Sequence, residues 1–306
     1  MTLVESAQAD QMEKHYLKEQ YTVVKNTPTA NFSNKFQKLA KAAQQNWIAK
    51  TTASFRPECL TLYLSNLCNL GCKYCFAANI DGSRMPLEKN NALNPLFPIL
   101  NIEQVKAAAQ IVAKNCSDKK LDFKLVIHGG GEPTLHWNLL KEIVHVTKAI
   151  AKAHNIGWWG YIATNGIFPA EHAKWLALNF DLIGLSVDGP PDIQNKYRPK
   201  INGATTADLV KETAKIFNAS KANYKLRTTI HPDNLVRQTE IFLYLYQQFS
   251  PQSISFEPVY QSGRGINKAF TPRDATAFVS HFLATQKIAS NLNLSLIHIS
   301  EPTRPY

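Results

Sequence analysis

From residue 59 onward, short apolar runs typical of β-strands alternate with amphipathic stretches of helical length. Strands separated by helices of this length need crossover connections, and such connections produce a parallel sheet. Six such units predict an α/β fold that closes into a barrel or part-barrel rather than an open sheet. The predicted strands are 59–66, 122–130, 158–166, 180–189, 224–231 and 253–260, and the predicted helices lie near 102–116, 137–154, 169–178, 205–219, 235–249 and 273–290.

The ends of several predicted strands carry glycines and polar residues instead of apolar ones. Gly-Gly-Gly-Glu follows the second strand, Thr-Asn-Gly the third, and Ser-Val-Asp-Gly the fourth. In parallel α/β folds, functional sites are built in the loops after the carboxyl ends of the strands. We therefore expect the functional site at this end of the sheet.

Three segments lie outside the alternating pattern. Residues 1–58 are polar and predict an N-terminal helical extension. Residues 77–100 contain three prolines and no clear period, which predicts a long loop. Residues 294–306 resemble translated sequencing-adapter DNA, so we expect a non-native tail there, a core domain over 59–293, and a natural protein that continues into a further C-terminal domain.

The net charge of +11 raises the possibility of a nucleic-acid partner. However, the basic residues are spread along the whole chain, which favours a solvated basic surface over a dedicated patch. The N-terminus has neither the basic start nor the apolar run of a signal peptide, and no apolar run approaches the roughly eighteen residues of a membrane span. We therefore expect a cytoplasmic protein with no membrane partner.

Three of the five cysteines, Cys68, Cys72 and Cys75, lie within eight positions of one another. This crowding is unlike a secreted disulfide framework and is typical of a metal or cluster site in a reducing compartment. Three thiolates can hold three corners of an iron–sulfur cube and leave the fourth iron open to a ligand. Zinc is the alternative. It prefers four ligands, and although His128 and His136 are present, no second Cys-x2-Cys pair completes such a site.

The Cys-x3-Cys-x2-Cys spacing resembles the signature of the radical S-adenosylmethionine (radical SAM) superfamily. The resemblance covers residues 59 to about 290 and implies a partial (β/α)6 TIM-like barrel of the radical SAM type. It also implies a [4Fe-4S] cluster held by Cys68, Cys72 and Cys75, with S-adenosyl-L-methionine (SAM) on the open iron. Within the superfamily, the chain resembles the anaerobic sulfatase-maturase-like group, whose members carry a C-terminal SPASM domain after the barrel.

The same resemblance assigns contacts to SAM. Gly130, Gly131 and Glu132 match the Gly-Gly-Glu element, which binds the amino group of the SAM methionine. The physics agrees, because glycines let backbone carbonyls approach a ligand and a carboxylate or carbonyl suits an ammonium. Ser186 and Arg198 match a Ser-x-Asp-Gly…Arg pattern whose serine and arginine contact the ribose and carboxylate of SAM.

Four further SAM contacts rest on weaker matches. Thr164 and Asn165 belong to a Thr-Asn-Gly element, and Tyr74 stands where the family places an aromatic residue against adenine. A turn and a packed ring are the structural alternatives for these residues. Val259 falls near the point where the sixth strand of relatives touches adenine.

The resemblance implies reductive cleavage of SAM to methionine and a 5′-deoxyadenosyl radical, followed by abstraction of a hydrogen atom from a peptide or protein substrate. It implies an external one-electron reductant of the flavodoxin or ferredoxin type. No residue is assigned as the catalytic acid or base. Two alternatives stay open: a radical SAM enzyme acting on a small molecule or RNA, and a non-catalytic, basic, metal-binding protein that binds nucleic acid.

Overall fold

The computed structural model describes residues 41, 56–77, 99–259, 263–265 and 270–298. Most of the predicted N-terminal extension and of the predicted loop over 77–100 lies outside these residues, so both stay predictions. All the strands, and every helix discussed below, belong to a compact unit that begins at Pro57.

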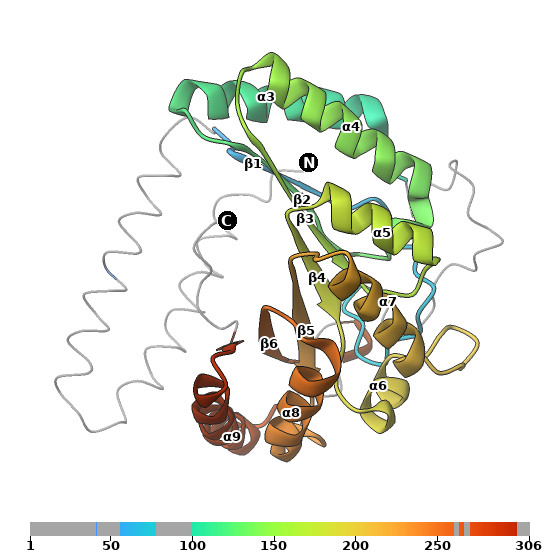
Figure 1. Ribbon diagram of the computed structural model, residues 1–306, viewed down its shortest axis with the longest axis vertical. Helices are drawn as coiled ribbons and strands as arrows, with labels where there is room; N and C mark the ends of the chain where they lie inside the picture. The colour runs from blue at the N-terminus through green and yellow to red at the C-terminus, as the bar shows by residue number, and fades with distance from the viewer. Residues whose placement is uncertain (1–40, 42–55, 78–98, 260–262, 266–269, 299–306) are drawn as a thin grey trace, which may run out of the picture. The chain divides into compact units, whose positions relative to one another are not determined.

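The described part of the chain forms a seven-stranded sheet in which all neighbouring strands are parallel and the strand order follows the chain (Figure 1). The predicted α/β class with a parallel sheet is therefore confirmed. The sheet is an open part-barrel, because β1 and β7 each have a single neighbour among the described strands. The strands are β1 (Cys59–Leu62), β2 (Phe123–Ile127), β3 (Trp158–Thr164), β4 (Leu182–Ser186), β5 (Tyr224–Ile230), β6 (Ser253–Pro258) and β7 (Ser295–His298).

Strand β7 was not predicted from the sequence. It pairs in parallel with β6, with Ser253 opposite Ser295, and it lies inside the segment 294–306 that we expected to be adapter-derived. No element was predicted there because the segment was interpreted as non-native. The proposed boundaries at 58 and 293 stay predictions.

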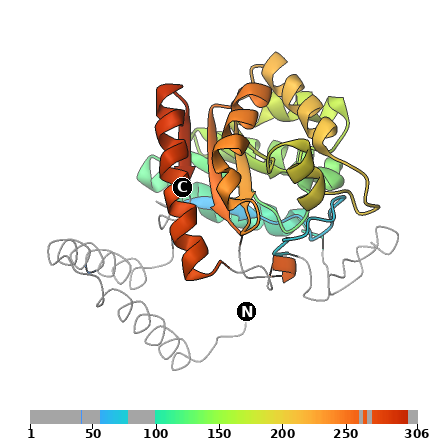
Figure 2. The same cartoon turned by 90° about the horizontal axis from the view of Figure 1, so that it is seen from below.

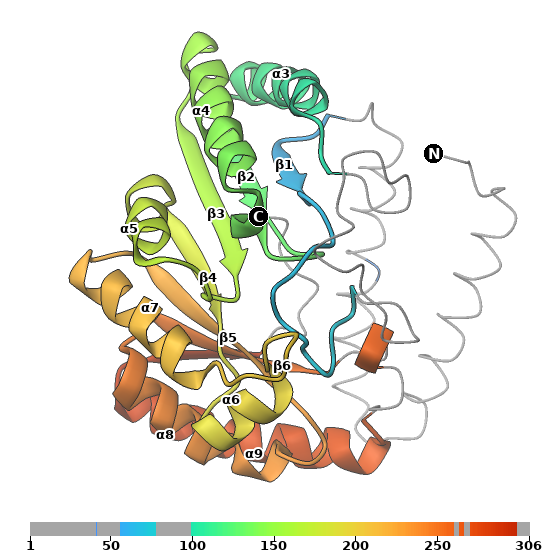
Figure 3. The same cartoon turned by 90° about the vertical axis from the view of Figure 1, so that its right-hand side faces the viewer.

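The helices of this unit cover one face of the curved sheet, as Figure 3 shows. Because each helix returns the chain to the start of the next parallel strand, all the crossovers lie on that face. Helix α9 packs against α8 and against β7, the last strand of the sheet (Figure 2). The longer helices are α3 (Ile102–Lys119), α4 (Trp137–Ala153), α5 (Ala170–Asn179), α6 (Pro191–Tyr197), α7 (Ala207–Ala219), α8 (Gln238–Phe249) and α9 (Pro272–Asn291), and the short 3-10 turns are η2 (Pro133–His136), η3 (Leu235–Arg237) and η4 (Gly263–Gly265).

Local sequence explains where the first and last of these helices begin. The Asn101 side chain accepts a hydrogen bond from the backbone N–H of Glu103 (2.8 Å) and caps α3. Thr271 and Asp274 form a reciprocal capping box at the start of α9. None of the described helices is long and apolar enough to cross a bilayer.

The core lies between the sheet and its helices. Phe123, Leu125 and Ile127 alternate along β2 and are fully buried against this layer. Fully burying a phenylalanine stabilises a fold by about 1.5–3 kcal/mol, so these side chains, with Phe217 and Phe249 from the helices, hold the layers together.

The opposite, concave face of the sheet is polar near the carboxyl ends of the strands. Along β5, Tyr224, Leu226, Thr228 and Ile230 are buried, while the residues between them are only half-buried. An ordinary closed barrel fills its interior with branched apolar side chains. In this protein a cavity occupies the position of the barrel interior.

Candidate functional site

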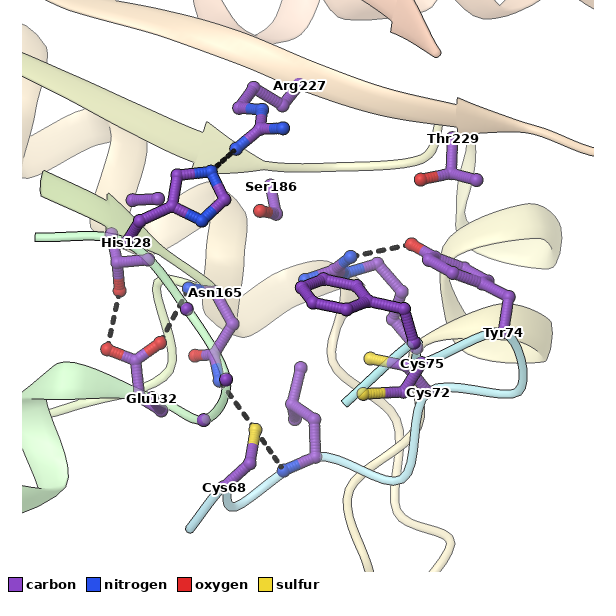
Figure 4. A pocket seen from close by; sticks show the side chains of 18 of the residues that line it. Cys68, Cys72, Tyr74, Cys75, His128, Glu132, Asn165, Ser186, Arg227 and Thr229 are labelled. Carbon is purple, nitrogen blue, oxygen red and sulfur yellow. Dashed lines mark hydrogen bonds between the residues drawn. The ribbon is translucent and has the colours of Figure 1, made fainter. Parts of the chain in front are cut away.

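A cavity of about 530 Å³ opens at the carboxyl ends of the strands on the concave face (Figure 4). All the site residues predicted from the sequence line it except Val259. It is lined by Cys68, Leu70, Cys72, Tyr74, Cys75, Phe76, His128, Gly129, Gly130, Gly131, Glu132, Ala163, Thr164, Asn165, Ser186, Arg198, Arg227, Thr229, Glu257 and Pro258.

The three clustered cysteines lie on the segment after β1, residues 66–77, which we call the cluster loop. Its backbone pairs with residues 197–201, which begin at the last residue of α6: the N–H of Gly71 donates to the carbonyl of Pro199 (2.8 Å), and the N–H of Lys73 to the carbonyl of Tyr197 (2.9 Å). A side chain at Gly71 would meet the backbone of Lys200, with its Cβ 3.4 Å from the carbonyl oxygen. The cluster loop is therefore held at close range by a second, strand-like segment.

The cluster loop is also held from the end of the sheet. Arg264, in the turn η4 that follows β6, donates from its backbone N–H to the carbonyl of Cys75 (3.1 Å) and from Nη1 to the carbonyl of Cys72 (3.2 Å). The contact joins residues 192 positions apart. It connects the segment after the first strand to the segment after the sixth.

Cys68 and Cys72 are buried, and Cys75 is partly exposed. The Cys68 sulfur lies 3.4 Å from the backbone N–H of Leu70 and 3.7 Å from the side-chain amide of Asn165. Burial raises the pKa of Cys72 to about 11, although the Arg198 guanidinium lowers it. Desolvation thus disfavours the thiolate form of Cys72. A bound metal cation would favour the thiolate and lower this pKa.

The spacing of the sulfurs distinguishes between kinds of metal site. In Figure 4 the sulfur of Cys68 lies apart from those of Cys72 and Cys75. Among the described residues, no three His, Cys, Asp or Glu side chains are gathered closely enough to hold a single metal ion. An iron–sulfur cube offers a separate iron to each thiolate, so three thiols arranged around one cavity fit that group.

The glycines after β2 allow this turn to pack directly on the cluster loop. A Cβ at Gly130 would lie 2.0 Å from Oδ1 of Asn66, and one at Gly131 would lie 1.8 Å from the carbonyl oxygen of Leu67. The next residue, Glu132, donates from its backbone N–H to that same Leu67 carbonyl (2.7 Å). Gly131 is therefore required by close backbone contact, not by an unusual φ.

The Glu132 carboxylate is buried and joins the ends of β2 and β3. Its Oε1 accepts hydrogen bonds from Thr134 and from the Thr164 hydroxyl (2.8 Å), and its Oε2 accepts one from the backbone N–H of Asn165 (2.8 Å). Burial raises the pKa of Glu132, and these hydrogen bonds oppose the shift. Each carboxylate oxygen offers about two acceptor positions, and Oε2 accepts one hydrogen bond among the described residues, so a ligand ammonium would find a remaining position on Oε2.

Asn165 connects this turn to the cluster loop. Its Nδ2 donates to Oδ1 of Asn69 (2.8 Å), and its Oδ1 accepts from the backbone N–H of Ile167 (2.8 Å). Asn69 in turn donates to the carbonyl of Ile167 (2.7 Å). The predicted Thr-Asn-Gly element thus has a structural role at the base of the cluster loop.

Arg198, Tyr74 and Asp188 form a buried network on another side of the cavity. Arg198 Nη1 donates to the Tyr74 hydroxyl (2.6 Å), which donates to Oδ2 of Asp188 (2.7 Å). Oδ1 of Asp188 accepts from the backbone N–H of Thr229 (3.2 Å). Burial raises the pKa values of Tyr74 and Asp188. Within the described part of the chain, Nε of Arg198 is buried without a hydrogen-bond partner, so this guanidinium keeps donor capacity.

The remaining two predicted contacts lie at strand ends. Ser186 ends β4 and lines the cavity. Val259 is buried beside β6, and its backbone N–H donates to the carbonyl of Ile230 (2.9 Å). At this strand it is Glu257 and Pro258 that line the cavity.

Sequence reasoning missed a second polar group in the cavity, formed by Arg227, Glu257 and His128. Arg227 binds Glu257 through two hydrogen bonds (2.8 and 2.9 Å), and its Nη1 lies 3.0 Å from Nε2 of His128. Burial, and then the positive charge of Arg227, lower the pKa of His128. The alternation of Lys225, Arg227 and Thr229 in an otherwise apolar strand was the signal that could have identified this face.

Comparison with known proteins agrees with this geometry. Residues 62–241, more than half of the chain, match the family model of the Radical SAM superfamily. The cysteine-type anaerobic sulfatase-maturating enzymes of Clostridium perfringens and Clostridium novyi are 25% and 27% identical to the chain over 221 and 228 residues, which is 71% of this chain in each case. The chain spans 56% of the length of each of these relatives.

Two solved structures share the fold. That of anSMEcpe with bound AdoMet superposes with a TM-score of 0.64 at 21% identity, over 78% of this chain and 63% of that one. Streptococcus suis SuiB bound to the precursor peptide SuiA gives a TM-score of 0.56 at 16% identity, over 94% of this chain and 61% of that one.

Proposed function

The chain belongs to the radical SAM superfamily, and on that premise we propose that it is an enzyme that cleaves SAM reductively at a [4Fe-4S] cluster and removes a hydrogen atom from a peptide or protein substrate. The observation that carries the proposal is a single cavity lined by the three clustered thiols, the Gly-Gly-Glu turn and the buried Arg198. The proposed setting is a reducing cytoplasm, where free thiols persist.

The residues present fit both cofactors. Cys68, Cys72 and Cys75 would hold the cluster, and the cluster, when bound, supplies the electron that splits SAM into methionine and a 5′-deoxyadenosyl radical. Arg198 has a free donor for a carboxylate, and its orientation is fixed by Tyr74 and Asp188.

The protein's own part in the reaction is to position the reactants and exclude water. The carbonyls of the Gly130–Gly131 turn and the remaining capacity of Glu132 suit an ammonium. The half-buried Arg227 and Glu257 also line the cavity, and in this proposal they contact the substrate. A radical is protected when the reacting carbon is held close and competing hydrogen donors are kept out.

A peptide substrate is supported by the relatives. Sulfatase-maturating enzymes are named for acting on a protein, and SuiB was solved with a precursor peptide. We extend this substrate class to the chain as part of the proposal.

The test is anaerobic reconstitution of the purified chain with iron and sulfide. We expect cluster assembly, seen as visible absorbance and iron content, and reductant-dependent release of 5′-deoxyadenosine from SAM. Cys72→Ala should abolish both, and Cys59→Ala, which removes a cysteine outside the cluster loop, should leave both intact. A colourless protein that binds zinc, or a cluster that does not cleave SAM, would refute the proposal.

A further inference from the structure

The cluster loop has an outer side as well as the inner side that lines the cavity. Residues 197–201 pair with its outer edge, with an isolated antiparallel bridge between Leu70 and Lys200. Lys73, between Cys72 and Cys75, is exposed, whereas Cys72 is buried. The thiol-bearing backbone thus reaches the surface here.

The two stretches of chain that form this surface carry charged residues of a single sign. In the two stretches that form it, 66–77 and 195–206, every charged residue is a lysine or arginine. Arg198 is buried beside Asp188, and Lys196 is paired with Asp233 (2.7 Å). Lys73 and Lys200 form no ion pair with any residue that the structure describes. Two lysines therefore remain to attract an acidic partner.

An apolar side chain follows Lys200 in the chain. Ile201 is 53% exposed, and its backbone N–H donates to the carbonyl of Asn69 in the cluster loop (3.2 Å). An apolar contact rimmed by charge of one sign is the composition expected of a small, transient protein interface. Electron-transfer encounters are at the small end of interface size, below about 1,200 Å².

The proposed function requires that one electron reach the cluster for each SAM cleaved. Electron transfer slows steeply with distance, so the donor has to approach the cluster loop closely. The inner side of the loop is the proposed SAM site, which leaves the outer side for the donor. Charge complementarity speeds such encounters more than it tightens them.

We propose that Lys73, Lys200 and Ile201 form the docking surface for a small acidic one-electron carrier protein, which loses one electron as the oxidised cluster gains it. The inference rests on the proposed function. It adds the place at which the reductant binds and the sign of the charge that recognises it.

The test compares two double variants of equal charge. Lys73→Glu/Lys200→Glu reverses the charge of the docking surface. Lys114→Glu/Lys152→Glu reverses the charge of two exposed lysines on α3 and α4, outside both stretches. Each reconstituted protein is mixed with reduced flavodoxin, and cluster reduction is followed by stopped-flow absorbance. Reduced methyl viologen, a small cation that needs no docking surface, serves as the second reductant.

We expect the docking variant to be reduced by flavodoxin about tenfold or more slowly than wild type at low salt, and the control variant to match wild type. The difference should shrink at high ionic strength, where the Debye length falls to about 3 Å at 1 M. Reduction by methyl viologen should be the same in all three. If Lys73→Glu/Lys200→Glu does not take up iron, Lys73→Gln/Lys200→Gln should show a smaller loss of the same kind.

Equal flavodoxin rates in the docking and control variants would overturn the inference. The inference would also be overturned if Lys73→Glu/Lys200→Glu weakened binding of single-stranded nucleic acid but left the rate of reduction by flavodoxin unchanged. Failure of the proposed function is a different result, since then the wild-type protein would release no 5′-deoxyadenosine with methyl viologen either.

Discussion

Replacing Gly131 by alanine should destabilise the protein well beyond the usual cost of one methyl group. The new Cβ would lie 1.8 Å from the Leu67 carbonyl oxygen, and ordinary contact begins at 3.4 Å, so the two backbones have to separate by about 1.6 Å (3.4 minus 1.8). That separation also breaks the hydrogen bond from Glu132 to Leu67. Overpacking costs about 1–3 kcal/mol and an unsatisfied buried N–H about 1–3 kcal/mol, which together give about 2–6 kcal/mol.

Gly203→Ala is the matched control. Gly203 has a φ of +82° and nothing within 4 Å of the added Cβ, so the cost there is conformational and about 1–2 kcal/mol. Both variants would be unfolded with urea as cluster-free proteins under anaerobic conditions and followed by circular dichroism. The reasoning fails if Gly131→Ala loses no more stability than Gly203→Ala, because the close contact with Leu67 would then not constrain the fold.

Two further predictions concern charged side chains that line the cavity. Glu257→Leu leaves Arg227 without its carboxylate and should lower the free energy of unfolding by about 3 kcal/mol, while Arg227→Met/Glu257→Leu should restore most of it. A double-mutant cycle in urea with these variants and Arg227→Met that shows no coupling would contradict this. Burial raises the pKa of Glu132 from 4.5. The contribution of the Glu132 carboxyl to the free energy of unfolding is therefore fully present below pH 4.5, and it is lost as the pH rises through the folded-state pKa. Wild type should therefore lose stability relative to Glu132→Gln as the pH rises from 4.5, and a flat or opposite trend in the difference would count against it.

Local pattern was enough to predict most of the fold. Strand and helix periods are set within a few residues, and the parallel sheet follows from their alternation, which the structure confirms. Strand β7 was missed because residues 294–306 were interpreted as adapter-derived, not because the strand is short, since β1 has the same length and was predicted. The three cysteines were identified because their spacing is itself the signal, and the family match supports that interpretation.

The parts of the site that could not be predicted depend on which segments meet in space. Nothing near Arg227 in the sequence indicates that it faces Glu257 and His128, which lie 30 and 99 positions away. The sequence also gave no sign that Glu132 binds Thr164 and the backbone of the next residue. Such contacts are long-range, and they decide whether a polar residue binds a ligand or supports a turn.

The contact between Arg264 and the carbonyls of Cys72 and Cys75 has a consequence for biosynthesis. The arginine is made 192 residues after Cys72, so at about 5–20 residues per second the ribosome needs roughly 10–40 s to supply it. During that interval the nascent cluster loop lacks one of its two sets of contacts, the hydrogen bonds from Arg264. Iron delivered after release of the finished polypeptide would meet a cluster loop that both sets of backbone contacts hold in place. Iron delivered earlier would meet a cluster loop without the Arg264 contacts.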